Sequence, residues 1–146
     1  MGFENRTRPE YLHLHSVQLI QGINSITRNT NITSDFPLGH GYTDKERLKD
    51  TTVGDNEWQN TTHSREPIDN GFFNFTFQNP VELKSVNVWN RVDHRNFVKN
   101  RWSQLFVKFL DENDDEIFRT GQIPWNNRPF HYNYIHGRQV GGDMKK

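Results

Sequence analysis

The segment Phe72–Gln78, FFNFTFQ, restricts the fold of this chain more than any other part of the sequence. Phe73, Phe75 and Phe77 alternate with polar residues, so a β-strand would carry all three rings on one face of a sheet. Aromatic rings bury a large area per residue. The segment therefore predicts a strand whose phenylalanine face packs against a core.

The rest of the chain contains further short alternating segments and no amphipathic helical period. Many short strands with turns between them are typical of an antiparallel β-sandwich, so we predict an all-β fold of jelly-roll type. We expect one domain over residues 11–140, a flexible N-terminal segment over 1–10, a tail over 141–146, mostly loop over 21–71, and no further strand after Gly137–Val140. The strands that we expect are Phe72–Gln78, Tyr11–Ile20, Val81–Trp89, Gln104–Leu110 with Ile117–Arg119 across the acidic turn Asp111–Glu116, and, less clearly, Ile123–Trp125 and Phe130–Ile135.

Composition excludes several classes of function. The 146 residues include 18 basic and 18 acidic side chains, and this zero net charge argues against nucleic acid and anionic membranes as partners. No apolar run approaches the roughly 18 residues of a transmembrane helix, and no signal peptide opens the chain. The absence of cysteine excludes disulfides and thiolate nucleophiles. No catalytic fingerprint is present, so we expect a protein that is not an enzyme.

Two regions could hold a metal ion. His13 and His15 alternate with apolar residues and would share one strand face, although solvated histidines on an open face are the favoured interpretation. The segment around Asp50, Asp55 and Asn56 is rich in oxygen ligands of the kind that calcium prefers. Turn-forming chemistry alone would also select those residues, so the calcium site is one of two interpretations.

The long polar segment after Trp89 carries Arg91, Arg95 and Arg101 between two expected strands. Loops held by a rigid sheet commonly supply binding residues. An arginine fork suits two neighbouring sugar hydroxyls, and Asp93 could hold an arginine in place. His63, Trp89 and Trp102 would add a hydrogen-bonding group and aromatic walls. A solvated loop accounts for the same residue types, and the residues alone leave both interpretations open.

A resemblance favours the binding interpretation. The order Leu48-x-Asp50, His63, a run F-x-F-x-x-P-V-E-L-x-x-V-x-V-x-N-R-x-D from Phe75 to Asp93, Arg101 and Leu105-x-Val107 is similar to fucolectins. These are eel-agglutinin-type lectins of the F5/8 type C, discoidin-like superfamily of galactose-binding-domain folds.

The resemblance implies a non-catalytic lectin domain that binds a terminal fucose or a galactose-type sugar. Its triad of sugar-binding residues would fall on His63, Arg91 and Arg101, with Arg95 as a competitor for the second arginine. It also implies a structural Ca²⁺ ion, glycans as partners, an extracellular or cell-surface location, and avidity from homo-oligomers or tandem modules. Four N-glycosylation sequons, at Asn5, Asn31, Asn60 and Asn74, are a weak hint in the same direction.

Two other functions stay open at this point. A discoidin-like module could bind a protein or lipid surface through exposed apolar loop tips, for which Phe97 is the obvious candidate. A structural or assembly sandwich without a small ligand would instead pair its arginines with the acidic turn. Neutral-sugar binding should respond little to salt, whereas a charge-paired interface should weaken as salt screens it.

Overall fold

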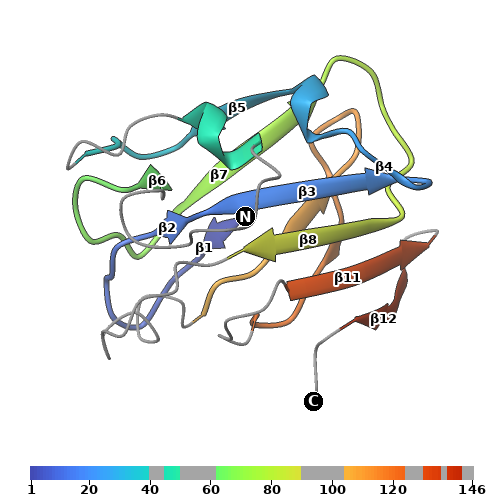
Figure 1. The fold of residues 1–146 in the computed structure, drawn as a ribbon. Helices are drawn as coiled ribbons and strands as arrows, with labels where there is room; N and C mark the ends of the chain where they lie inside the picture. Colours follow the sequence, from blue (N-terminus) through green and yellow to red (C-terminus); the bar gives the residue numbers. More distant parts are fainter. Residues whose placement is uncertain (40–44, 50–61, 90–103, 124–129, 136–137, 143–146) are drawn as a thin grey trace.

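A computed structural model describes residues 1–39, 45–49, 62–89, 104–123, 130–135 and 138–142 (Figure 1). Apart from two short 3-10 helices, the regular elements of the described residues are all strands. In chain order the elements are β1 (Gly2–Phe3), β2 (His13–Leu14), β3 (Ser16–Gln21), β4 (Asn24–Ser25), η1 (Thr27–Asn29), β5 (Thr30–Ser34), η2 (Lys45–Lys49), β6 (Thr62–His63), β7 (Gly71–Phe77), β8 (Ser85–Trp89), β9 (Lys108–Leu110), β10 (Glu116–Arg119), β11 (Phe130–Ile135) and β12 (Arg138–Gly142).

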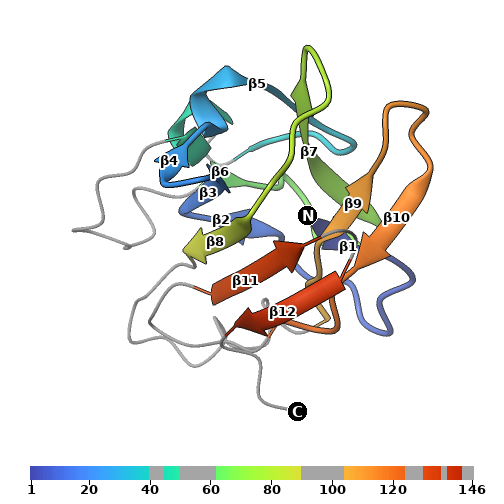
Figure 2. The same ribbon diagram turned by 90° about the vertical axis from the view of Figure 1, so that its right-hand side faces the viewer.

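The strands form two layers (Figures 1 and 2). One layer is a five-stranded sheet in the order β12-β11-β8-β3-β4. The other contains the three-stranded sheet β1-β7-β5, and a bridge from Gly2 to Phe106 brings the β9–β10 hairpin beside it. Every strand pairing among the described residues is antiparallel. The predicted all-β sandwich is therefore confirmed.

The core lies between these layers and follows the alternation of the sequence. Phe73 is completely buried, and Phe75 and Phe77 pack against the core on the same strand, as predicted. In the five-stranded sheet, Val17 lies opposite Val88, and Leu19 lies opposite Val86. All four of these aliphatic side chains are buried. Removal of this apolar surface from water is the main contribution to the stability of the fold.

The prediction of a flexible N-terminal segment is wrong for its first residues. Gly2 and Phe3 form β1, which pairs with β7 on one side and meets Phe106 on the other. The Phe3 side chain is completely buried. A Cβ atom on Gly2 would overlap the Gly71 carbonyl oxygen, so only glycine lets the two backbones approach this closely. Phe3, the residue after Gly2, anchors this segment in the core.

Several predicted strand boundaries also differ from the structure. Within residues 21–71 the sequence did not predict β5, which pairs along its whole length with β7. β8 begins at Ser85 rather than Val81, and β9 begins at Lys108 rather than Gln104. Ile123 lies in no strand.

At the C-terminal side, Phe130–Ile135 is confirmed as β11. Arg138–Gly142 forms a further strand, β12, that the sequence did not predict. It pairs with β11, so that the sandwich extends past residue 140.

The predicted hairpin across the acidic turn is confirmed. β9 and β10 pair antiparallel, and Asp111 Oδ1 accepts hydrogen bonds from the backbone amides of Asn113 at 2.8 Å and Asp115 at 3.0 Å. These bonds explain the acidic composition locally, because an aspartate oxygen can satisfy the turn's own amides.

Candidate functional site

The segment from Tyr11 to Gln21 joins the two parts of the sandwich at one end. Its first strand, β2, pairs with β6 and sets His13 opposite His63. Its second strand, β3, pairs with β8 and sets Ser16 opposite Trp89. In Figure 1, β2, β6 and the end of β8 lie at the left of the molecule. We call this the histidine end and define it by five residues: Tyr11, His13, Ser16, His63 and Trp89.

His63 lies on a strand, not in the polar loop that the sequence suggested, and its side chain is buried with 7% exposure. Its Nδ1 atom is 2.6 Å from the Ser64 carbonyl oxygen. Since a carbonyl oxygen only accepts, Nδ1 carries a hydrogen in this contact. The ring also contacts the rings of Tyr11 and His13, with centroids 4.9 and 5.7 Å away.

The interpretation of His13 and His15 as solvated histidines is wrong. Their exposed fractions are only 2% and 6%. The cause is the double pairing of this segment, since His13 pairs with β6 and the His15 amide donates to the Trp89 carbonyl at 3.0 Å. Within the described ranges, no three His, Cys, Asp or Glu side chains gather closely enough to hold a metal ion.

Ser16 and Trp89 form the second cross-strand pair of this end. Ser16 is completely buried, yet its hydroxyl finds no hydrogen-bond partner among the residues that the structure describes. The same is true of the buried Nε1 atom of Trp89. A buried polar atom without a partner costs roughly 1–3 kcal/mol, so it indicates a group that something else satisfies. No sequence pattern pointed to Ser16.

Of the residues predicted to bind sugar, the structure describes His63 and Trp89 and brings them to the same end. Arg91, Asp93, Arg95, Arg101 and Trp102 lie outside the described residues, as do the proposed calcium ligands Asp50, Asp55 and Asn56. The strand ends that flank these segments are nevertheless informative. In sequence, the arginine-bearing segment directly follows β8, which ends at Trp89, and the Asp50–Asn56 segment precedes β6, which begins at Thr62.

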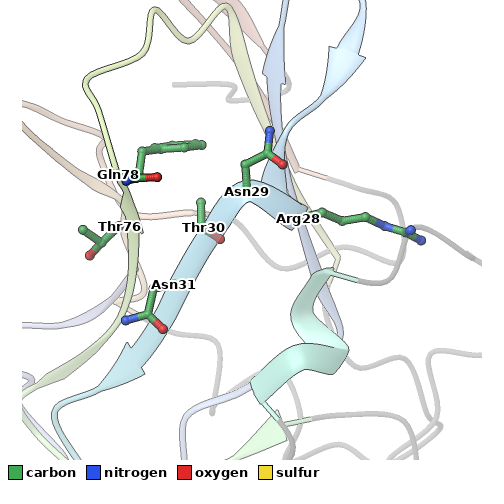
Figure 3. Close-up of a pocket in the computed structure, with 7 residues that line it drawn as sticks. Arg28, Asn29, Thr30, Asn31, Thr76 and Gln78 are labelled. Atoms are coloured by element: carbon green, nitrogen blue, oxygen red, sulfur yellow. The ribbon is translucent and has the colours of Figure 1, made fainter.

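A second polar feature lies where β5 begins and β7 ends, away from the histidine end. A shallow groove of about 360 Å³ opens there (Figure 3). Sequence analysis missed this groove, because its residues come from strands whose pairing is not encoded locally. The residues that line it are Arg28, Asn29, Thr30, Asn31, Thr76, Phe77 and Gln78.

Comparison with protein-family models, curated proteins and solved structures finds no match to this chain. Among the described residues, no helix has the length and apolar character needed to cross a membrane.

Proposed function

We propose that this chain is a non-catalytic carbohydrate-binding domain whose site lies at the histidine end and takes a terminal fucose or a galactose-type sugar. One observation carries the proposal. His63 and Trp89, which are far apart in sequence, lie at the same end of the sandwich because β2 pairs with β6 and β3 pairs with β8. The segment with Arg91 and Arg101 begins directly after Trp89.

The chemistry of this end suits a neutral, hydroxyl-rich ligand. In a neutral ring whose Nδ1–H bonds to the Ser64 carbonyl, Nε2 of His63 would be an acceptor of the kind that suits a sugar hydroxyl. The Nε1–H group of Trp89 and the hydroxyl of Ser16 are buried in the free protein, so a ligand would reach them only after neighbouring side chains move. In this proposal, the guanidinium groups of Arg91 and Arg101 each bind two neighbouring hydroxyls.

Substitution of the first arginine tests the proposal. Arg91→Ala should reduce binding of L-fucose or D-galactose by about a hundredfold or more, because two hydrogen bonds from a charged group are lost. Arg8→Ala, an exposed arginine near the N-terminus, is the matched control and should bind like the wild type. A glycan array and titration calorimetry would measure binding, and urea unfolding would verify the fold. Undiminished sugar binding by Arg91→Ala would overturn the assignment.

The same assay decides between the two candidates for the second arginine. If Arg101 holds the sugar, Arg101→Ala should weaken binding as strongly as Arg91→Ala, and Arg95→Ala should have little effect. The reverse order would assign the role to Arg95.

One observation favours a second candidate function, the binding of a protein or lipid surface. Ile23 occupies the turn between β3 and β4 and is 93% exposed, whereas the candidate named from the sequence, Phe97, lies outside the described residues. Single exposed apolar side chains are common on protein surfaces, and a contact surface needs several of them, so in this alternative Ile23 is one residue of the contact. Ile23→Ser should abolish sedimentation with neutral phosphatidylcholine vesicles if this function is real, and should leave sugar binding unchanged.

A further inference from the structure

We propose that Asn70, directly before β7, is a site of spontaneous covalent modification, at which the side-chain amide is lost and the residue becomes aspartate or isoaspartate. The substrate is the chain itself, and the co-reactant is water. An Asn-Gly sequence favours this reaction, because glycine has no side chain to hinder the approach of its backbone nitrogen to the asparagine side chain. Asn70-Gly71 is the one such sequence in the chain. The inference does not depend on the proposed sugar binding.

The fold uses both residues of this sequence. Gly71 has φ +146°, a conformation that residues with a side chain rarely adopt, and an added Cβ atom would lie 2.8 Å from Phe36 Cδ1. The Oδ1 atom of Asn70 accepts a hydrogen bond from the backbone amide of Asn5 at 2.8 Å. The reactive sequence therefore stands where the fold needs a glycine and, next to it, a side-chain oxygen.

The hydrogen bond from Asn5 also favours attack on the Asn70 side chain. When a nucleophile adds to Cγ, this carbon becomes tetrahedral and negative charge develops on Oδ1. A backbone amide that already donates to this oxygen stabilises the developing charge without reorganisation. Asn70 is exposed, so water can reach the site and ammonia can leave it.

The modification has two steps. In the first, the backbone nitrogen of Gly71 attacks Cγ of Asn70. The N–Cγ bond forms, the Cγ–Nδ2 bond breaks, and Nδ2 leaves as ammonia with the proton of the Gly71 amide. In the second step, water opens the cyclic succinimide. Addition at Cγ gives aspartate, whereas addition at the main-chain carbonyl carbon gives isoaspartate, whose backbone runs through Cβ and Cγ. No atom is oxidised or reduced.

The two products should affect the fold differently. Aspartate keeps a side-chain oxygen as the acceptor for the Asn5 amide. Isoaspartate adds a methylene group to the backbone between Asp69 and Gly71. The chain is tied to the N-terminal segment on both sides of this point. The Arg6 amide donates to the Asp69 carbonyl at 3.0 Å, and Phe3 pairs with Gly71. A longer backbone would shift one of these contacts out of register, so isoaspartate should loosen the N-terminal segment.

Ageing of the folded protein tests the modification site. The 146-residue chain would be kept in mildly alkaline buffer at physiological temperature. Samples would be labelled by protein isoaspartyl methyltransferase and mapped by peptide mass spectrometry. Asn70 should be the first asparagine of the chain to gain isoaspartate. The isoaspartate fraction, separated by chromatography, should unfold at a lower urea concentration than the fresh protein.

Three variants sharpen the experiment. Asn70→Gln keeps an amide oxygen but would have to close a larger, less favourable ring, so it should lose most of the label. Asn24→Gln changes an exposed asparagine that precedes Ser25 in β4, and this matched control should keep the label of the wild type. Asn70→Asp reproduces the other product and should unfold like the fresh protein, because its carboxylate still accepts from the Asn5 amide.

Two outcomes would overturn the inference. If isoaspartate forms at Asn70 in the urea-unfolded chain but not in the folded chain, the fold protects this residue. If Asn70→Gln keeps the label of the wild type, the modified residue lies elsewhere. An isoaspartate fraction as stable as the fresh protein would contradict the loosening of the N-terminal segment. None of these measurements uses a sugar, so their result is separate from that of Arg91→Ala.

Discussion

The two ends of the sandwich use similar polar residues in opposite ways. At the histidine end, His13 and Ser16 are buried, with exposures of 2% and 0%. At the end where β5 begins and β7 ends, which we call the groove end, Asn31, Thr76 and Gln78 are exposed. Both sets belong to or adjoin strands that alternate polar and apolar residues. The difference arises because the segment 11–21 pairs with both β6 and β8, whereas the outer face of β5 and β7 remains open at the groove end.

This difference in burial predicts how each end responds to substitution. A buried polar group is coupled to the packing around it, so a change at the histidine end should alter stability as well as binding. An exposed amide exchanges water for a ligand with little effect on the fold. Matched substitutions at the two ends therefore test this difference.

The largest expected effect comes from two phenylalanines on β7. Phe73→Ala, toward the histidine end, removes a completely buried ring that packs edge to face against Phe36 at 5.0 Å. We expect it to lower the free energy of unfolding by about 3–5 kcal/mol. Phe77→Ala, at the groove end, should cost only about half as much, because that ring is half-buried. Urea unfolding followed by far-UV circular dichroism would measure both values.

Equal losses for the two phenylalanine variants would contradict the comparison. They would show that packing at the groove end is as tight as at the histidine end, and the open groove would then be a poor description of β5 and β7 in solution.

Two glycines give the next largest contrast. Gly71 has φ +146°, and a Cβ atom there would lie 2.8 Å from Phe36 Cδ1. Gly22, in the β3–β4 turn at the other end, has φ +61°, and a Cβ atom there would meet nothing within 4 Å. Gly71→Ala should therefore cost about 2–3 kcal/mol, from strain and overpacking together. Gly22→Ala should cost about 1 kcal/mol, from the backbone conformation alone.

Thermal unfolding of the two glycine variants would measure this contrast. A Gly22→Ala variant as destabilised as Gly71→Ala would mean that the β3–β4 turn is packed rather than open. The two glycines would then not differ in the free space around them.

The sequence pattern predicted those elements whose conformation depends mainly on residues close together in the chain. Alternation identified the phenylalanine face of β7, and the turn chemistry at Asp111–Glu116 identified the β9–β10 hairpin. Alternation failed where both faces of a strand are covered, as at His13, because sequence spacing gives the faces of a strand but not its neighbours. β5 was missed for a related reason, since TNITS carries a single aliphatic residue and is held by its pairing with β7.

The candidate site was predictable only in part. Trp89 and His63 could be proposed from residue type and resemblance, but their placement at one end depends on which strands pair. Ser16 could not be proposed at all, because a serine in an apolar strand usually indicates a solvated position. Its burial without a described partner is a property of the assembled sheet.

The smallest expected effect concerns two serines, Ser16 of the histidine end and Ser64 next to His63, and the two substitutions should change stability in opposite directions. Both Ser16 and Ser64 are completely buried. Ser64 Oγ accepts a hydrogen bond from the Leu12 amide at 3.0 Å and donates to the Glu66 carbonyl at 2.9 Å. Ser64→Ala leaves both groups without this partner, so it should lower the free energy of unfolding by about 1–2 kcal/mol.

Ser16→Ala should do the opposite. Its hydroxyl has no described partner, so its removal relieves a desolvation cost and should raise the free energy of unfolding by about 1 kcal/mol. If that hydroxyl instead serves a ligand, the same variant should bind L-fucose or D-galactose more weakly while being more stable. Urea unfolding and titration calorimetry on one preparation would measure both. A Ser16→Ala variant that is less stable than the wild type would show that the hydroxyl already has a partner in the free protein, and Ser16 would then belong to the fold rather than to the site.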